Sequence, residues 1–216
     1  MKKTAILLGA TGLTGSILLK NLLADPDFVK VKLFSRTASA VKHDKIEEHI
    51  VDLFRLEEYK VSFKGDAVFC CIGTTKAKTP DRDTYKAIDY GIPVAAAKLA
   101  KENHIPVFMV ISALNANPDS RIFYNKTKGE MQRDILAQGV PQTYILQPSL
   151  ITGNRNEKRF GEDLANTLMK VFDFLIPKKY KRIHAQTIAN ALLKLSKKPY
   201  TNNLIPSDEI RKLGQG

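Results

Sequence analysis

The chain has no tryptophan and only two cysteines among its 216 residues, and these two, Cys70 and Cys71, are adjacent within an apolar run. Adjacent cysteines do not suit a disulfide framework, so they favour a reducing compartment and a buried strand over a redox or metal role. Three histidines, His43, His49 and His104, lie apart, with no carboxylate or cysteine at the spacing of metal ligands. We therefore expect no metal site.

Long hydrophobic runs are also absent. No apolar run approaches the roughly 20 residues that a membrane-spanning helix needs. The N-terminal sequence MKKTAILLGATG lacks the longer apolar region and the cleavage site of a signal peptide. We expect a cytoplasmic protein with no membrane partner.

Acidic residues are in the minority, because 22 Asp and Glu face 34 Lys and Arg, giving a net charge of +12. Three causes compete: an anionic cofactor or substrate, a nucleic acid, or a solvated lysine-rich surface. Basic residues are spread along the whole chain, with local runs at 155–159 and 178–182, whose roles the sequence leaves open. No zinc-finger spacing, RNP aromatic motif or basic heptad accompanies them, so we favour a solvated surface and expect no nucleic-acid partner.

Glycine, in contrast, is concentrated near the N-terminus. The apolar run Ala5–Leu8 leads into Gly9, Gly12 and Gly15, spaced as GxxGxxG, and then into Ser16–Leu23, which has apolar residues at helical spacing. This pattern predicts a strand, a tight turn and a helix whose N-terminus binds the pyrophosphate of a dinucleotide. The alternative is a tight turn without a ligand, but the context that the motif requires is present.

The end of the next strand, expected over Val31–Arg36, bears on the choice of cofactor. In such sites a carboxylate here holds the ribose hydroxyls, whereas an arginine accommodates a 2′-phosphate. This chain has Ser35, Arg36 and Thr37, and no carboxylate. We therefore favour NADP(H) over NAD(H), with Arg36 as the main phosphate ligand and the hydroxyls of Ser35 or Thr37 as donors. The alternative for Arg36 is an exposed charge at a strand end.

Two further strand ends are candidates for cofactor contacts. Asp52 and Leu53 follow a strand expected over 49–51, where the carboxylate would either meet the adenine amino group or cap the next helix. The apolar run 65–75 is typical of a parallel strand buried on both faces. Its end, at Ile72, Gly73 and Thr74, is expected to open onto the cofactor.

The remaining chain continues the alternation of strands and helices. We expect strands at 105–112 and 142–149, a terminal edge strand with a final turn, and helices at 56–63, 83–103 with an interruption at Pro93, 124–138, 162–175 and 185–195. The helix at 162–176 is amphipathic, which suits a core or dimer face better than a membrane anchor and leaves a homodimer open. The fold class predicted is α/β: one Rossmann-like domain over 1–216, a doubly wound parallel sheet with helices on both faces, and a small substrate-side portion from about 149 onward.

A catalytic set is predicted at the same edge of the sheet. Tyr124 and Lys128 are four residues apart in FYNKTKGE and share one helix face, while Ser112 ends the preceding strand. Hydride transfer to a carbonyl leaves an oxygen that must be protonated, and a phenol with a pKa of about 10 exchanges protons poorly at neutral pH. We expect Lys128 to lower the pKa of Tyr124 and to hold the ribose, and Ser112 to orient the carbonyl. A tyrosine four residues before a lysine is otherwise common in helices without any catalytic role.

The roles of two other residues stay open. His184 precedes a helix and could face the substrate cleft, although a capping or solvent-exposed role is favoured. Asn115, just after Ser112, either shapes the pocket or makes a turn.

The segments GATGLTG, FSR, FCCIGTTKAK, VISALNANPDS with FYNKTKGE, and ILQPSLITGNRNE together resemble an atypical short-chain dehydrogenase/reductase over residues 4 to about 195. The branch most similar is that of the Tat-interacting proteins, small NADPH-binding proteins of one Rossmann domain. The resemblance implies Gly9, Thr11, Gly12, Leu13 and Thr14 at the pyrophosphate, Arg36 at the 2′-phosphate, Cys71, Ile72 and Gly73 near adenosine and ribose, Ser112, Tyr124 and Lys128 at the nicotinamide end, and Pro148, Ser149 and Leu150 along the nicotinamide face.

The resemblance implies an NADP(H)-dependent oxidoreductase that transfers hydride to or from a small carbonyl or alcohol substrate. Members of this branch are also known as regulators without an established substrate, so the alternative is a non-catalytic NADP(H)-sensing or protein-binding module. Relatives often have Arg-Pro where this chain has Gln147-Pro148, and this departure falls at the expected pocket entrance.

Overall fold

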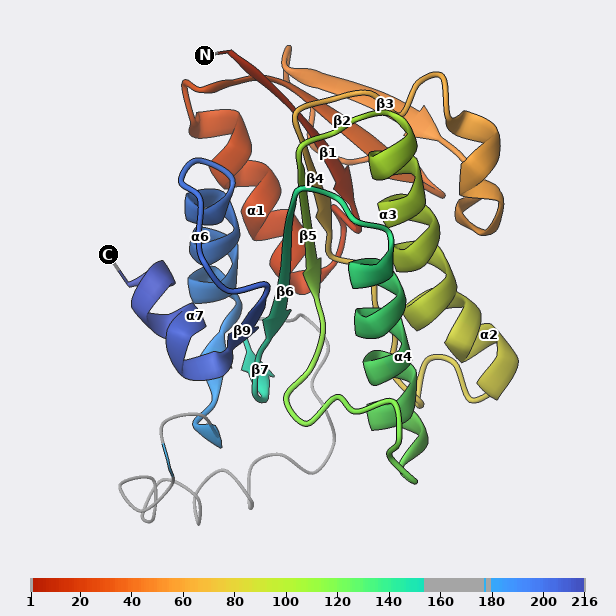
Figure 1. The fold of residues 1–216 in the computed structure, drawn as a ribbon. Helices are drawn as coiled ribbons and strands as arrows, with labels where there is room; N and C mark the ends of the chain where they lie inside the picture. The colour runs from red at the N-terminus through yellow and green to blue at the C-terminus, as the bar shows by residue number, and fades with distance from the viewer. Residues whose placement is uncertain (1, 154–176, 178–179, 216) are drawn as a thin grey trace.

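The computed structural model describes residues 2–153, 177 and 180–215. Within these residues the chain forms a parallel sheet of seven strands in the order β3-β2-β1-β4-β5-β6-β9 (Figure 1). The strand order reverses direction between β1 and β4, and open α/β sheets bind ligands outside the carboxyl ends of the strands at such a point. The strands are β1 (Lys3–Leu8), β2 (Phe28–Ser35), β3 (Ile46–Ile50), β4 (Ala67–Cys70), β5 (Val107–Ile111), β6 (Gln142–Gln147) and β9 (Leu204–Pro206).

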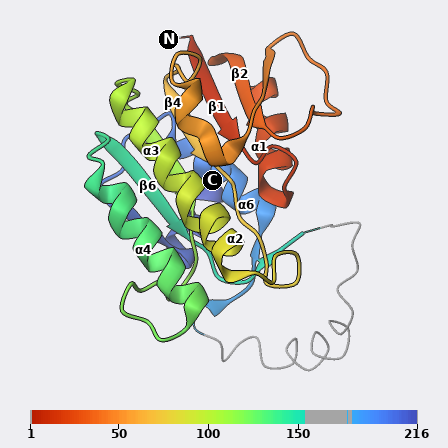
Figure 2. The ribbon, with the colours of Figure 1, turned by 90° about the vertical axis from the view of Figure 1, so that its right-hand side faces the viewer.

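Helices cover both faces of the sheet, which confirms the predicted doubly wound α/β class (Figure 1, Figure 2). One face carries α1 (Leu13–Ala24), α6 (Ala185–Leu195) and α7 (Ser207–Gly214). The other carries the 3-10 helix η1 (Leu53–Tyr59), α2 (Arg82–Lys86), the π-helical turn η2 (Ala87–Gly91), α3 (Ile92–Glu102) and α4 (Phe123–Ala137). Two short strands, β7 (Ile151–Thr152) and β8 (Ile183–His184), pair in parallel apart from the main sheet.

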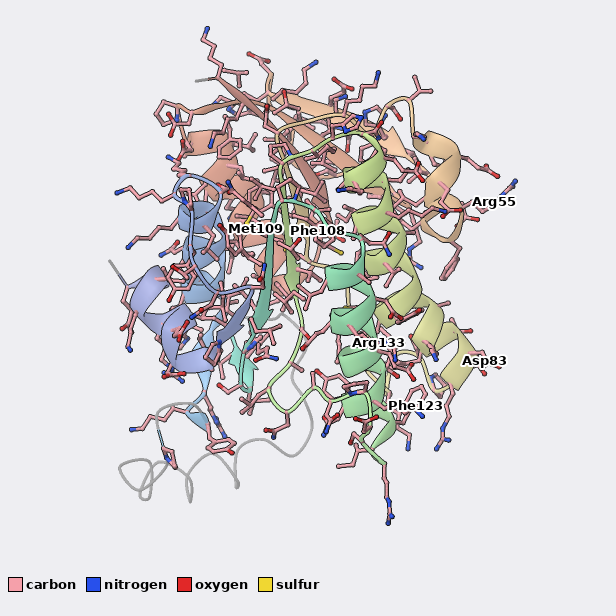
Figure 3. The ribbon with its side chains drawn as sticks, in the orientation of Figure 1. Arg55, Asp83, Phe108, Met109, Phe123 and Arg133 are labelled. Atoms are coloured by element: carbon pink, nitrogen blue, oxygen red, sulfur yellow. The ribbon has the colours of Figure 1, made fainter. Side chains whose placement is uncertain are left out.

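The two layers follow from strands that are apolar on both faces. In β5, Phe108 packs among the buried side chains beneath α3 and α4, while its neighbour Met109 packs among those beneath α1 and α6. Figure 3 shows these two side chains on opposite sides of the sheet. Successive strand residues point to opposite faces, so a continuous apolar run is what a centrally buried parallel strand requires.

The helix expected over 83–103 is present but is not uniform. The N–H of Ile92 donates to the carbonyl of Ala87, five residues earlier, so a π-turn separates α2 from α3. Pro93 lies in the first turn of α3, where its missing N–H costs nothing. The predicted interruption at Pro93 is therefore a π-turn that ends just before it, and single π-turns occur frequently at functional sites.

Other predicted elements are found with shifted ends. The helix expected at 56–63 is the 3-10 helix η1, which begins earlier because Asp52 caps it. The final turn is a full helix, α7, and β9 is the edge strand expected beside β6. No helix in the described part of the chain is long and apolar enough to cross a membrane.

Some predictions fall on residues that the structure does not describe. The helix expected at 162–175, the basic run at 155–159 and part of the run at 178–182 lie outside the described residues. After them α6 packs against α1, and β9 joins the main sheet. A substrate-side portion from about 149 onward stays a prediction.

Candidate functional site

The turn between β1 and α1 can be built only with glycine at two of its positions. Gly9 has a φ of +84°, and a Cβ built there would lie 2.7 Å from the carbonyl oxygen of Cys71. A Cβ at Gly15 would lie 2.0 Å from the carbonyl oxygen of Gly9. Glycine is thus required because the backbones of β1, the segment after β4 and the start of α1 pack directly against one another here.

The start of α1 is suited to an anion. Gly12 occupies the N-cap position without a side-chain hydrogen bond, and the first turn holds no acidic residue. Free N–H groups and the helix dipole therefore act together at this point. The residues fit the pyrophosphate of a dinucleotide, with the exposed Thr11 at the rim of the turn and Leu13 and Thr14 in the first helical turn.

The end of β2 presents a free cation. The guanidinium of Arg36 is exposed, and it makes no hydrogen bond or ion pair with the described residues. The Ser35 hydroxyl donates to the carbonyl of Thr37 at 2.7 Å, which fixes the loop on both sides of Arg36. Arg36 therefore stands beyond the carboxyl end of β2, free to meet a phosphate, and its role as a ligand stays a prediction.

Asp52 performs the capping role that the sequence left open. Its Oδ1 accepts a hydrogen bond from the N–H of Phe54 at 2.9 Å at the start of η1. The side chain of Leu53 is buried in the core beneath η1. Contacts of either residue with an adenine stay predictions.

The end of β4 runs beside the glycine turn. The N–H of Cys71 donates to the carbonyl of Leu8 at 2.9 Å, which continues the pairing with β1 past the last strand residue. Burial raises the pKa of the Cys70 thiol to about 11 and raises that of Cys71 as well. Both sulfurs are therefore protonated at neutral pH and lack the thiolate that reactive cysteines use.

A buried ion pair joins the π-turn η2 to α4. The Lys128 ammonium and the Oδ1 atom of Asp89 lie 2.7 Å apart, and these residues are 4% and 1% exposed. The second carboxylate oxygen of Asp89 accepts the backbone N–H of Thr74, also at 2.7 Å. The carboxylate thus connects Lys128 directly to the loop after β4, and its position in the π-turn η2 turns it inward.

Ser112 lies in a second buried hydrogen-bond chain. Its hydroxyl oxygen accepts a bond of 2.6 Å from the side-chain amide of Gln132, whose own oxygen accepts one of 3.1 Å from Gln147. Because Ser112 accepts from Gln132, its hydroxyl proton remains available for a substrate oxygen. Gln147 is therefore part of the support of Ser112.

Tyr124 stands at the mouth of this arrangement, 40% exposed. The Lys128 cation lowers the pKa of this phenol, as predicted, but the pKa is raised overall. Burial of the phenol raises the pKa, the Lys128 cation lowers it by less, and the carboxylate of Asp89 raises it further. The prediction left out the burial of the phenol, which is the largest cause, and the carboxylate of Asp89, which adds to it.

The loop after β5 is held tightly against α4. A Cβ built on Gly129 would lie 2.2 Å from backbone atoms of Asn117 and Pro118, so the helix and the loop meet backbone to backbone. The N–H of Asn117 also donates to the carbonyl of Asn125 at 3.0 Å. Asn115 makes the turn in this loop with a φ of +63°. This contact fixes Ser112 relative to Tyr124 and Lys128.

The chain after β6 closes the site toward the glycine turn. The carbonyl of Pro148 accepts the N–H of Leu114 at 2.9 Å, and the Ser149 hydroxyl donates to the carbonyl of Lys181. Leu150 is half exposed, and a Cβ on Gly153 would lie 2.9 Å from the side chain of Leu13. The segment predicted to cover the nicotinamide therefore runs from the loop after β5 to the start of α1.

His184 does not cap α6 with its side chain. The ring is exposed, and its Nδ1 lies 3.3 Å from the hydroxyl of Thr152. Its position is thus at the surface beside the small β7–β8 pair.

Sequence reasoning missed two members of the site, Asp89 and Gln132. Gln132 carried a signal, because Tyr124, Lys128 and Gln132 are four residues apart and share one helix face. Asp89 carried none, since an aspartate within an expected helix ordinarily faces solvent. Its burial depends on the π-turn.

The sequence of this chain is similar to those of known proteins. A family model described as NAD(P)H-binding matches residues 9–199. The protein FMP52-1, mitochondrial, of Scheffersomyces stipitis is 35% identical over 161 residues, which are 72% of this chain and 70% of that protein. The protein HTATIP2 of Rattus norvegicus is 32% identical over 167 residues, which are 76% of this chain and 69% of that protein.

Solved structures share the fold at low sequence identity. The UDP-glucose 4-epimerase of Thermotoga maritima superposes with a TM-score of 0.70 at 11% identity, covering 98% of this chain and 81% of the epimerase. The UDP-N-acetylglucosamine 4-epimerase of Methanobrevibacter ruminantium gives 0.72 at 16% identity, with the same two coverages. At such identities the likeness concerns the fold alone.

Proposed function

This chain belongs to the NAD(P)H-binding family of Rossmann proteins of the atypical short-chain dehydrogenase/reductase type, with HTATIP2 and FMP52 as relatives, and we propose that it is an NADP(H)-dependent oxidoreductase acting on a small carbonyl or alcohol. The family membership confirms the resemblance found in the sequence. The observation that carries the proposal is the buried Lys128, fixed 2.7 Å from Asp89, one helical turn from Tyr124. A lysine is rarely buried without a specific use or partner.

Hydride donation is the chemistry that a bound nicotinamide supplies in this reaction. In the direction of reduction, the Ser112 hydroxyl donates a hydrogen bond to the carbonyl oxygen and orients it. Tyr124 then donates a proton to the same oxygen as general acid. Lys128 holds the ribose and provides positive charge beside the phenol.

The raised pKa of Tyr124 favours one direction of this chemistry. Above its ordinary value of about 10, the pKa keeps the phenol protonated throughout the neutral range. A protonated phenol is the acid that carbonyl reduction needs, whereas alcohol oxidation needs the phenolate as base. We therefore propose carbonyl reduction as the working direction at neutral pH.

NADP(H) is the cofactor proposed, on account of Arg36. Its guanidinium is exposed and unpaired among the described residues, at the strand end where a 2′-phosphate binds in dinucleotide sites of this fold. The partners proposed are a small-molecule substrate and a second copy of the chain, with no nucleic acid or membrane. The location proposed is the cytoplasm, although the names of the FMP52 relatives include the word mitochondrial.

The direct test is the variant Tyr124→Phe, which removes only the phenolic oxygen. We expect carbonyl reduction to fall by about 10²–10⁴-fold, the usual contribution of a general acid, while NADPH binding followed by nicotinamide fluorescence stays unchanged. Ser112→Ala serves as the second variant, with the same expectation for binding. Full activity in Tyr124→Phe would refute the assignment. Failure of the wild type to reduce any carbonyl, with NADPH binding intact, would favour the cofactor-sensing module.

A further inference from the structure

A hollow of about 470 Å³ is lined in part by Tyr124. The loop after β4 contributes threonines and Lys76, the start of α2 contributes Arg82 and Tyr85, and the start of α4 contributes Phe123 and Tyr124. Figure 3 shows Phe123 at the end of α4 that lies near α2. The volume falls within the roughly 300–1,000 Å³ that ligand pockets enclose.

The wall of the hollow combines aromatic surface with positive charge. The Arg82 guanidinium lies over the Phe123 ring, 5.3 Å from its centroid, and the rings of Tyr85 and Phe123 meet edge to face at 5.6 Å. Stacking on an aromatic face restrains the guanidinium while leaving its N–H donors free. The start of α2 is thus an ordered cation beside an apolar surface.

No carboxylate from the described part of the chain lines the hollow. Among the described residues that line it, Lys76 and Arg82 carry charge and none is acidic. Neither cation forms an ion pair with a described residue. Two acids flank Arg82 in sequence: Asp81 accepts the N–H of Thr84 at 2.8 Å as the cap of α2, Asp83 lies in the first turn of α2, and neither lines the hollow. The hollow therefore has a positive potential that a ligand would neutralise.

We infer that the substrate is a carbonyl compound that carries an anionic group, a carboxylate or a phosphate, bound by Arg82 and Lys76 while its carbonyl lies at Tyr124. This inference rests on the proposed function, because it names the substrate class of that same site. The aromatic walls would contact the apolar body between the two groups. Arg82 and Lys76 are specificity residues in this arrangement and take no part in the chemistry.

The phosphates of the cofactor are the other source of negative charge. They are expected at the glycine turn and at Arg36, and none of those residues lines the hollow. The inference therefore assigns Lys76 and Arg82 to the substrate, and the experiment must separate the two sources.

Two probes of matched shape provide the test: 4-carboxybenzaldehyde and its neutral amide, 4-formylbenzamide. We expect the wild type to reduce the carboxylate with a kcat/KM at least about tenfold above that of the amide. The double variant Lys76→Gln/Arg82→Gln should lose this preference through a higher KM for the carboxylate. Turnover of the amide and binding of NADPH should stay unchanged. The control Lys20→Gln/Lys194→Gln removes the same charge from exposed sites on α1 and α6, across the sheet, and should keep the preference.

Binding of both probes to the protein loaded with NADP⁺, measured by calorimetry, keeps the two hypotheses separate. The wild type could reduce neither probe yet bind the carboxylate more tightly, with that difference lost in the double variant. This result would support an anionic ligand in the hollow and would refute hydride transfer to it. Equal turnover of both probes would overturn the inference and leave the proposed function intact. Weaker NADPH binding in the double variant would also overturn it, since the cations would then serve the cofactor.

Discussion

Replacing Asp89 by asparagine should destabilise the protein strongly, although the side chain keeps its shape. Asparagine can still accept the N–H of Thr74, but it leaves the ammonium of Lys128, only 4% exposed, without its partner at 2.7 Å. At an effective dielectric constant of about 20, two unit charges at that distance attract by about 6 kcal/mol. Part of this attraction offsets the desolvation of both ions, and breaking a buried pair on one side usually costs about 3–5 kcal/mol. We expect a loss of that size in the free energy of unfolding.

The assay is a double-mutant cycle by urea denaturation at pH 7. Asp89→Asn and Lys128→Met should each be strongly destabilising, whereas the double variant should lie close to the wild type, because no unpaired charge remains. Glu57→Gln provides a matched control: Glu57 and Lys98 also lie 2.8 Å apart, but both side chains are about half exposed, so little stability should be lost. Additive losses in the double variant, or a loss at Asp89 as small as that at Glu57, would refute the reasoning.

Three other expectations can be checked with simple variants and assays. Gly15→Ala should reduce the free energy of unfolding by about 2 kcal/mol or more, because its Cβ would lie 2.0 Å from the Gly9 carbonyl oxygen. Gly91→Ala, with no atom within 4 Å of the new Cβ, should be neutral or stabilising in the same denaturation experiment. Arg36→Ala should weaken NADPH binding about tenfold in a fluorescence titration and leave NADH binding nearly unchanged; equal weakening of both would contradict a 2′-phosphate contact. The raised pKa of Tyr124 predicts that kcat/KM for carbonyl reduction is flat through neutral pH. The kcat/KM for alcohol oxidation should increase with pH toward and beyond about 10, as the phenolate forms. An oxidation rate already at its maximum at pH 7 would contradict this prediction.

The sheet and its cofactor edge could be predicted from the sequence because their causes are local. Continuous apolar runs such as the one ending at Cys70 leave a centrally buried parallel strand as the arrangement that covers both faces. Gly9 and Gly15 predict a turn without side chains. In the structure, atoms of the neighbouring backbone occupy the space that a Cβ would need at either position. In both cases the requirement lies within a few residues of the chain.

The environment of the candidate catalytic residues could not be predicted in the same way, because it depends on contacts between distant segments. The pKa of Tyr124 depends first on the burial of its phenol and also on Asp89, which lies 35 positions earlier in the chain and is buried within a π-turn that no spacing rule indicates. Gln147 supports Ser112 through Gln132, a link that exists only once β6 has aligned with β5. Residue types and spacing identified the candidate catalytic residues. The charges and hydrogen bonds around these residues could be found only from the tertiary structure.

The connection between Ser149 and Ser207 has a consequence for the order in which the protein matures during synthesis. The N–H of Ser149 donates to the Ser207 hydroxyl at 3.2 Å, across a separation of 58 residues, and β6 gains its outer neighbour only from β9. Domains emerge from the ribosome N-terminus first, at about 5–20 residues per second. The glycine turn and the first strands can therefore assemble while the wall beside the predicted nicotinamide position is still unsupported. A nascent chain stalled before residue 204 would hold the dinucleotide edge of the sheet but not a finished substrate side.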